Sequence, residues 1–296
     1  MLVHYKVLIS VMSTFKAFIK RYPLLNYFIL AFIISWGFAT LIVGCSEIVN
    51  IRATETEQKL PLVIMAMVIG PTLAGLLSIW LDDSKEGLKS LLSRLRKKPE
   101  NKRWYLALLI APASLVITDL LLMFFSPSFI PAVISEIDKL SFLGFTFFGA
   151  LVGGFFEEIG WTGFVIPKML KRLNIFKTGL LLGLIWGAWH FLVNFWGSAI
   201  SSGEVPLVIY LSVALFSFLV PYRILMVWVY SHTNSLLLSI LMHSSLITFW
   251  LAFGPTIGTG IFGVIWFLTW TIILWIMVFA INNFTKGKLT KNFQIK

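Results

Sequence analysis

Residues 140–166 read LSFLGFTFFGALVGGFFEEIGWTGFVI, an apolar run whose only ionisable side chains are two adjacent glutamates, Glu157 and Glu158. The run is longer than the roughly 20 apolar residues that cross a bilayer as a helix. It lacks the polar–apolar alternation of a membrane barrel strand. Because hydrocarbon offers no partner for backbone groups, the run is predicted to be a transmembrane helix.

The rest of the chain has the same character. Of its 296 residues, 58% are hydrophobic and 12% are charged, whereas soluble domains are about half apolar and a quarter charged. The same criterion of length and hydrophobicity predicts seven further spans, near 24–46, 61–81, 104–125, 175–197, 205–230, 234–253 and 258–283. The predicted fold is therefore an all-α, polytopic membrane helix bundle of about eight spans over residues 24–284, without a soluble domain.

The basic residues predict the orientation of this bundle. Eight spans place both termini on one side, and 20 of the 24 Lys and Arg residues then fall on that side. The positive-inside rule assigns that side to the cytoplasm. We therefore expect a multi-pass protein of the cell membrane, with a basic interfacial arm at 1–23 and a basic cytoplasmic tail at 285–296. The basic blocks lie between apolar runs, so membrane lipid is the expected partner and nucleic acid is not.

The longest polar stretch is residues 82–103. It carries four leucines at helical spacing, Leu88, Leu91, Leu92 and Leu95, among eight basic residues. This pattern predicts a basic amphipathic helix that lies on the cytoplasmic membrane surface and helps to set the orientation.

Ionisable side chains inside a membrane cost roughly 2.5 to 3.5 kcal/mol each on insertion scales, so each one needs a reason. The predicted spans contain six, namely Asp119, Glu157, Glu158, His190, Arg223 and His243. At 1.5 Å per residue, Glu157, His190 and His243 lie about 16, 20 and 14 Å from the cytoplasmic ends of their spans. All three thus fall near the middle of a hydrocarbon core about 30 Å thick and are expected to form one site.

Two of the six have other expected roles. Asp119 lies about 24 Å along its span, towards the outer face, and is expected to be a hydrogen-bonded structural residue. Arg223 lies within about two turns of the cytoplasmic end, where it could snorkel to the interface or pair with a glutamate. His4 and His232 fall outside the spans and are expected to be solvated.

Glycines mark the helix faces that carry the candidate site. Gly149, Gly153 and Gly160 share a face with Glu157, and Gly179, Gly183 and Gly187 lead to His190 one turn later. Small residues at this spacing allow membrane helices to approach closely. We therefore expect Glu157 and His190 to face packed helices and not lipid.

The candidate residues permit few chemistries. A carboxylate held in low dielectric can accept a proton from water, and two imidazoles can orient that water and stabilise an oxyanion. Alternatively, Glu157, His190 and His243 could hold a divalent metal such as zinc with an open coordination position. Because Cys45 is the single cysteine, any metal must use His and carboxylate ligands. The same groups also fit a proton relay, so the residues alone leave a hydrolase and a proton-coupled transporter open.

Three segments, in order along the chain, resemble the motifs of the CPBP intramembrane proteases, which include CAAX prenyl endopeptidases and bacteriocin-processing or self-immunity proteins. The first is Glu157-Glu158-Ile-Gly-Trp-Thr162, where the family has Glu-Glu-x-x-x-Arg. The second is Trp186-Gly-Ala-Trp-His190, where the family has Phe-x-x-x-His, and the third is Leu-Met-His243-Ser-Ser. The resemblance covers about 140–255, which we take as the CPBP-like core.

This resemblance implies an intramembrane endopeptidase acting on a peptide or protein substrate. It implies that Glu157 activates water as the general base. It also implies that His190 and His243 position the water and stabilise the oxyanion, and that Glu158 supports them. Because members of the family have also been described as metalloproteases, the resemblance keeps a zinc ion as an expectation.

Two residues depart from the family pattern. Thr162 stands where the motif has arginine, and Ile247 stands where the family often has asparagine, four residues after His243. Either the site is rebuilt, with Arg223 replacing the lost cation, or the chain is a catalytically inactive immunity or binding protein that keeps the scaffold.

Overall fold

The computed structural model describes residues 20–44, 53–197, 205–255 and 260–291. In these ranges eight helical segments are long and apolar enough to cross a membrane, and the sole β-type pairing is one bridge between Pro131 and Pro255. The spans are Pro23–Val43, Gln58–Asp82, Lys102–Met123, Lys139–Leu170, Ile175–Trp196, Leu207–Thr233, Leu236–Phe253 and Gly260–Phe284. The predicted all-α polytopic bundle is confirmed.

Parts of four predictions lie outside the described residues. These are residues 1–19 of the N-terminal arm, residues 292–296 of the tail, and the ends of the first and last predicted spans, 45–46 and 258–259.

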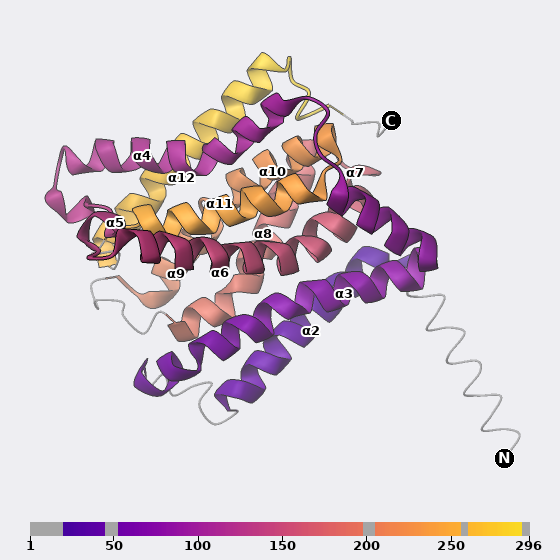
Figure 1. The fold of residues 1–296 in the computed structure, drawn as a ribbon, viewed down its shortest axis with the longest axis horizontal. Helices are drawn as coiled ribbons and strands as arrows, with labels where there is room; N and C mark the ends of the chain where they lie inside the picture. The colour runs from indigo at the N-terminus through magenta and orange to yellow at the C-terminus, as the bar shows by residue number, and fades with distance from the viewer. Residues whose placement is uncertain (1–19, 45–52, 198–204, 256–259, 292–296) are drawn as a thin grey trace, which may run out of the picture.

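The bundle has two outer helix pairs and a central group. The major helices are α2 (Pro23–Val43), α3 (Ala53–Arg96), α4 (Ile110–Met123), α6 (Lys139–Gly160), α8 (Ile175–Gly197), α9 (Leu207–Phe216), α10 (Leu219–Thr233), α11 (Leu236–Phe253) and α12 (Gly260–Phe284). Shorter elements are η1 (Lys102–Leu109), η2 (Pro127–Phe129), α5 (Ala132–Ser135), η3 (Trp161–Val165) and α7 (Ile166–Leu170). In Figure 1, α2 and α3 lie together on one side and α4 and α12 on the other, with α6, α8, α10 and α11 between them.

The polar stretch at 82–103 differs from its prediction. Most of it continues the second span, because α3 runs without interruption to Arg96 and bends before its C-terminal end (Figure 1). Three of its four leucines face the protein: Leu91 is 7% exposed, and Leu88 and Leu95 pack against the buried core, whereas Leu92 is 44% exposed. The segment is amphipathic as expected. Its apolar face covers the helix bundle, however, and is not free to lie on a membrane surface.

The sixth span also differs, because it is two helices. The chain leaves the helical path at Ser217 and Phe218, between α9 and α10. Pro221 lies in the first turn of α10, where a missing N–H costs no helical hydrogen bond. The proline therefore starts the second helix and does not interrupt it.

Glycine contacts confirm the predicted packing face on α8 and most of the one on α6. A Cβ added at Gly179 would lie 2.4 Å from the Ile224 Cα, so α8 and α10 are in backbone contact there. On α6 the prediction is confirmed at Gly160, whose added Cβ would lie 2.3 Å from the Pro71 carbonyl oxygen of α3, and at Gly153, whose added Cβ would lie 3.6 Å from the Ile247 Cδ1 of α11. It is wrong at Gly149, which has nothing within 4 Å, and it missed Gly154, whose added Cβ would lie 2.8 Å from the Ser244 Oγ of α11.

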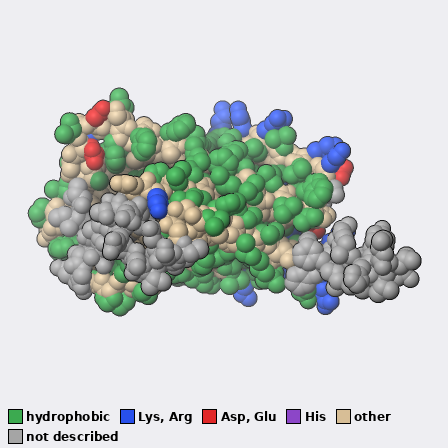
Figure 2. Space-filling view, turned by 90° about the horizontal axis from the view of Figure 1, so that it is seen from below, with side chains coloured by type: hydrophobic (Ala, Val, Ile, Leu, Met, Phe, Trp, Pro, Cys, Tyr) green, Lys and Arg blue, Asp and Glu red, His purple; other side chains and the backbone are tan. Residues whose placement is uncertain are grey.

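The outer surface has the polarity of a membrane protein. Figure 2 shows a broad face of exposed hydrophobic side chains, with most of the visible Lys and Arg towards one end. That end carries the junction of α7 and α8, in agreement with the predicted basic side. The protein is therefore a multi-pass membrane protein, and its orientation remains a prediction.

Candidate active site

The centre of the candidate site is the fully buried Glu158 carboxylate near the end of α6. Arg223 of α10 donates from Nη1 to both carboxylate oxygens, at 2.9 and 3.0 Å. His243 of α11 places Nδ1 2.8 Å from Oε1. Three helices are thus joined through one carboxylate, and its buried charge has the direct cationic partner that such a charge needs.

Thr162 completes the set of donors to Glu158. Its hydroxyl, one turn later on the same helix, donates to Oε2. Thr162 stands at the arginine position of the motif, so the local cation is replaced by a hydroxyl while Arg223 supplies the charge from another helix. The expected possibility that Arg223 pairs with a glutamate is confirmed.

The backbone departs from α-helical geometry at this point. Residues Trp161–Val165 form a π-helical turn, η3, directly after the two glutamates and within the fourth span. Such turns are rare and occur often at functional sites. The hydrophobicity pattern gave no sign of it, because a π turn does not change the apolar character of the run.

Glu157 has a different environment from its neighbour. It is 3% exposed, and its Oε2 accepts a hydrogen bond of 2.8 Å from the Trp186 indole Nε1. Its Oε1 lies 3.9 Å from the His190 Nε2, too far for a direct hydrogen bond. Glu157 therefore keeps one oxygen that no strong donor occupies.

The two histidines are held in defined orientations. The His190 Nδ1 lies 2.9 Å from the Trp186 carbonyl oxygen, and the His243 Nδ1 lies 2.8 Å from the Glu158 carboxylate. Both partners are acceptors, so each Nδ1 carries the proton. In the neutral imidazoles each Nε2 is then an unprotonated acceptor.

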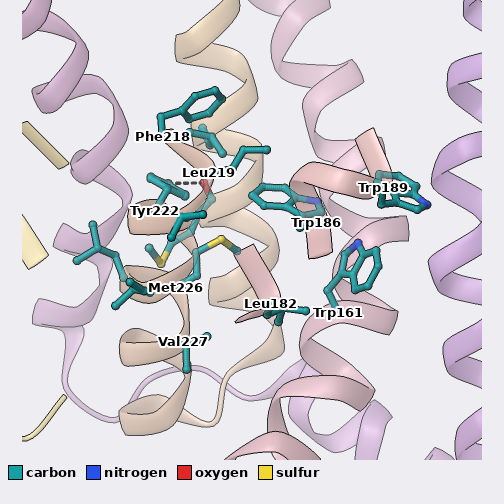
Figure 3. Packing of buried hydrophobic residues seen from close by; sticks show 14 of the residues in the cluster. Trp161, Leu182, Trp186, Trp189, Phe218, Leu219, Tyr222, Met226 and Val227 are labelled. Atoms are coloured by element: carbon teal, nitrogen blue, oxygen red, sulfur yellow. Dashed lines mark hydrogen bonds between the residues drawn. The ribbon is translucent and has the colours of Figure 1, made fainter. Parts of the chain in front are cut away.

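Trp186 joins the two halves of the site. Its ring lies 3.9 Å from the Arg223 guanidinium carbon and packs edge-on against both His190 and His243. Figure 3 shows it between the α10 side chains and the pair formed by Trp161 and Trp189. Trp186 stands where the motif has phenylalanine, which has no N–H to donate. The sequence placed it near the site but did not reveal its hydrogen bond to Glu157.

The four predicted site residues, Glu157, Glu158, His190 and His243, thus lie in one cluster, in which His190 is partly exposed and the other three are buried. Asp119 lies elsewhere: it accepts a 2.8 Å hydrogen bond from Trp266 between α4 and α12, as expected for a structural residue. His232 is exposed, also as expected. His4 lies outside the described residues.

The residues do not form a ready metal site. In the described part of the chain, no group of three or more His, Cys, Asp or Glu side chains is arranged to hold a metal ion. The donor types suit zinc, because both histidine Nε2 atoms and the Glu157 Oε1 keep free lone pairs, but the described positions of these side chains do not bring three such donors together.

The fold and this cluster define a class: a polytopic helical membrane protein with glutamate, histidine and arginine buried between its spans. Residues 139–249, which contain the whole cluster, match the family model described as Type II CAAX prenyl endopeptidase Rce1-like. The resemblance to the CPBP family is confirmed for this segment.

A curated relative supports the same assignment. The chain is similar to CAAX prenyl protease 2 of Methanococcus maripaludis, with 28% identity over 94 residues. The match covers 31% of this chain and 35% of the relative, so the chain matches about a third of the relative's length.

Proposed function

We propose that this protein is an intramembrane endopeptidase that hydrolyses a peptide bond with a water molecule activated by Glu157. One observation carries the proposal: the 3.9 Å gap between the Glu157 Oε1 and the His190 Nε2. A polar separation above 3.5 Å is suited to a bridging water. A water there would contact a carboxylate base on one side and an imidazole nitrogen on the other.

The reaction then needs two proton transfers. Glu157 accepts a proton from the water as the water oxygen forms a bond to the substrate carbonyl carbon. The tetrahedral intermediate collapses by breaking the C–N bond, and Glu157 returns the proton to the departing amine. Atoms and charge balance, because the products are a carboxylic acid and a neutral amine, and the acid then passes its proton to the amine to give a carboxylate and an ammonium group.

The histidines serve the attacking water and the developing oxyanion. His190 orients the water by accepting a hydrogen bond from it at Nε2. This nitrogen is available because the Nδ1–H is held by the Trp186 carbonyl oxygen. In its doubly protonated form His243 would present Nε2–H to the oxyanion while Nδ1–H stays on Glu158. Glu158 is therefore a positioning residue that fixes His243 and is itself fixed by Arg223.

Access to the site is proposed from the His190 side. The His190 side chain is 22% exposed, whereas that of Glu157 is 4% exposed. A peptide would reach the imidazole first and the carboxylate behind it. This arrangement limits bulk water at the reacting bond.

The substrate class follows from the family and not from the geometry. The family description and the name of the curated relative refer to CAAX prenyl proteases, and we propose a membrane-associated peptide or protein segment as the substrate of this chain. The basic side, on which both termini are predicted to lie, is proposed to face the cytoplasm of the cell membrane. Comparing the membrane proteomes of cells carrying wild type or Glu157→Gln would identify the segment that is cut.

The test of hydrolysis is a cleavage assay with the purified full chain in liposomes and a peptide library that includes prenylated peptides. In water enriched in oxygen-18, the proposal expects one labelled oxygen in the new C-terminal carboxylate and a free amine on the other fragment. An absence of cleavage across the library in correctly folded protein would contradict the proposal.

A second candidate function, a catalytically inactive binding or immunity protein, is favoured by Ile247. This residue faces α6, because its Cδ1 lies 3.6 Å from a Cβ added at Gly153. An apolar side chain thus stands one helical turn after His243, where the family often has an amide. If a cellular phenotype survived both Glu157→Gln and His243→Ala, the inactive alternative would be correct.

A further inference from the structure

A second site lies at the basic end of the bundle, apart from the glutamate and histidine cluster. It is a cavity of about 770 Å³ between the ends of α3, α7 and α10 and the start of η1. Its lining includes four cations, Arg94, Lys97, Lys168 and Lys171, and one carboxylate, Glu100. None of the proposed catalytic side chains lines it, so its chemistry is separate.

The positive charge of this cavity is largely uncompensated. Lys168 is paired with Asp82. For Lys97 and Lys171, the described part of the chain provides no salt bridge, and Arg94 contacts uncharged groups, Tyr230 and Ser90. An anion is therefore the ligand that this lining would favour.

Arg94 is fixed in position before any ligand arrives. Its Nη1 donates 2.7 Å to the hydroxyl of the buried Tyr230. A guanidinium has five N–H donors, so others remain for a ligand. An arginine held in this way loses little side-chain freedom on binding and suits the oxygens of a phosphate group.

The depth of the cavity points to a lipid. Ile79 and Trp104 line it, and they lie close to the basic ends of the second and third spans. Two residues further into each span, Leu77 is 41% exposed and Leu106 is 63% exposed. The cations thus lie at headgroup level, with apolar surface for acyl chains beside them.

We propose that this cavity binds the phosphate-bearing headgroup of an anionic phospholipid. Gly163 and Phe164 of η3 form part of its wall, and Thr162 beside them donates to Glu158. The headgroup would therefore lie against the π-helical turn that follows the two glutamates. This binding does not depend on the proposed peptidase activity.

Native mass spectrometry of the purified full chain tests the proposal by titration with phosphatidylglycerol and with phosphatidylcholine. The expected result is tighter binding of phosphatidylglycerol, and a loss of about tenfold or more in that affinity in Lys97→Gln/Lys171→Gln. The matched control is Lys98→Gln/Arg172→Gln, which removes the same charge from adjacent exposed positions that do not line the cavity. The control should stay within about twofold of wild type.

Three results would overturn the proposal. The first is equal affinity for the two lipids. The second is an equal loss in both double variants, which would show diffuse attraction to a basic surface. The third is full displacement of phosphatidylglycerol by millimolar inorganic phosphate, which would assign the cavity to a soluble anion.

Discussion

Arg223 and Glu158 form a buried ion pair between α10 and α6, with the Nη1 atom 2.9 Å from Oε1 and 3.0 Å from Oε2. The two residues are 65 positions apart, and neither side chain is exposed. This pair supplies from a neighbouring helix the cation that the family motif supplies from within α6.

Removing the cation is therefore expected to destabilise the bundle. Arg223→Leu leaves Glu158 as an uncompensated buried charge, which costs about 3–5 kcal/mol. Adding Thr162→Arg to that variant should restore part of the loss, because it returns a cation one turn from Glu158. Thermal unfolding in detergent measures both effects. A double variant no more stable than Arg223→Leu would show that the two positions are not equivalent.

Removing the indole N–H of Trp186 is expected to lower stability and activity more than removing the indole N–H of Trp189. Trp186→Phe removes the donor to Glu157, so we expect a loss of about 1–2 kcal/mol in stability and a fall in kcat greater than any change in KM. Trp189→Phe is the matched control, because the Trp189 Nε1 is buried without a hydrogen-bond partner. Equal effects of the two substitutions would show that ring volume, and not the N–H, is what the site uses.

Close contact between α8 and α10 gives a prediction about packing. Gly179→Ala places a methyl group against the backbone of Ile224 and should cost about 1–3 kcal/mol. Gly149→Ala meets open space and should be neutral or stabilising by up to about 1 kcal/mol through helix propensity. Thermal midpoints in one detergent compare the pair. A destabilised Gly149→Ala beside an unaffected Gly179→Ala would contradict the helix packing described above.

Orientation can be tested with single cysteines in a Cys45→Ser background. Lys139 and Lys171 lie near opposite ends of the fourth span, and both are exposed. A membrane-impermeant maleimide added to intact cells should label Lys139→Cys, and should label Lys171→Cys only after permeabilisation. The reverse pattern would place the basic side outside the cell.

Most of the fold could be predicted from the sequence, because a bilayer imposes length and hydrophobicity on every span. The helical rise alone predicts one depth for Glu157, His190 and His243, and the clustering of the three side chains agrees with it. The break at Ser217 and Phe218 and the path of residues 82–96 could not be predicted, because both depend on packing against distant helices. The sixth span is apolar enough to form one helix or two, and residues 82–96 are amphipathic enough to lie on a membrane surface or against the bundle.

The clustering of the four candidate side chains could be predicted from the sequence, but the hydrogen bonds that connect them could not. The pattern placed Glu158 and Arg223 inside the membrane, yet the choice between snorkelling and pairing depended on how α10 packs against α6. The hydrogen bond from Trp186 to Glu157 could not be predicted either, since the motif position is usually occupied by phenylalanine, which has no donor. The tryptophan at this apolar position adds an N–H, and that substitution was the signal from which a hydrogen bond could have been expected.

The most direct test of the central claim is the turnover of a cleaved peptide by wild type and by Glu157→Gln in the same detergent. Glu136→Gln serves as the control, because Glu136 is exposed and lies before α6, far along the chain from the cluster. Loss of a general base predicts a fall in kcat of about 10²- to 10⁴-fold in Glu157→Gln and no change in the control. Equal turnover in wild type and Glu157→Gln would show that Glu157 does not activate the water.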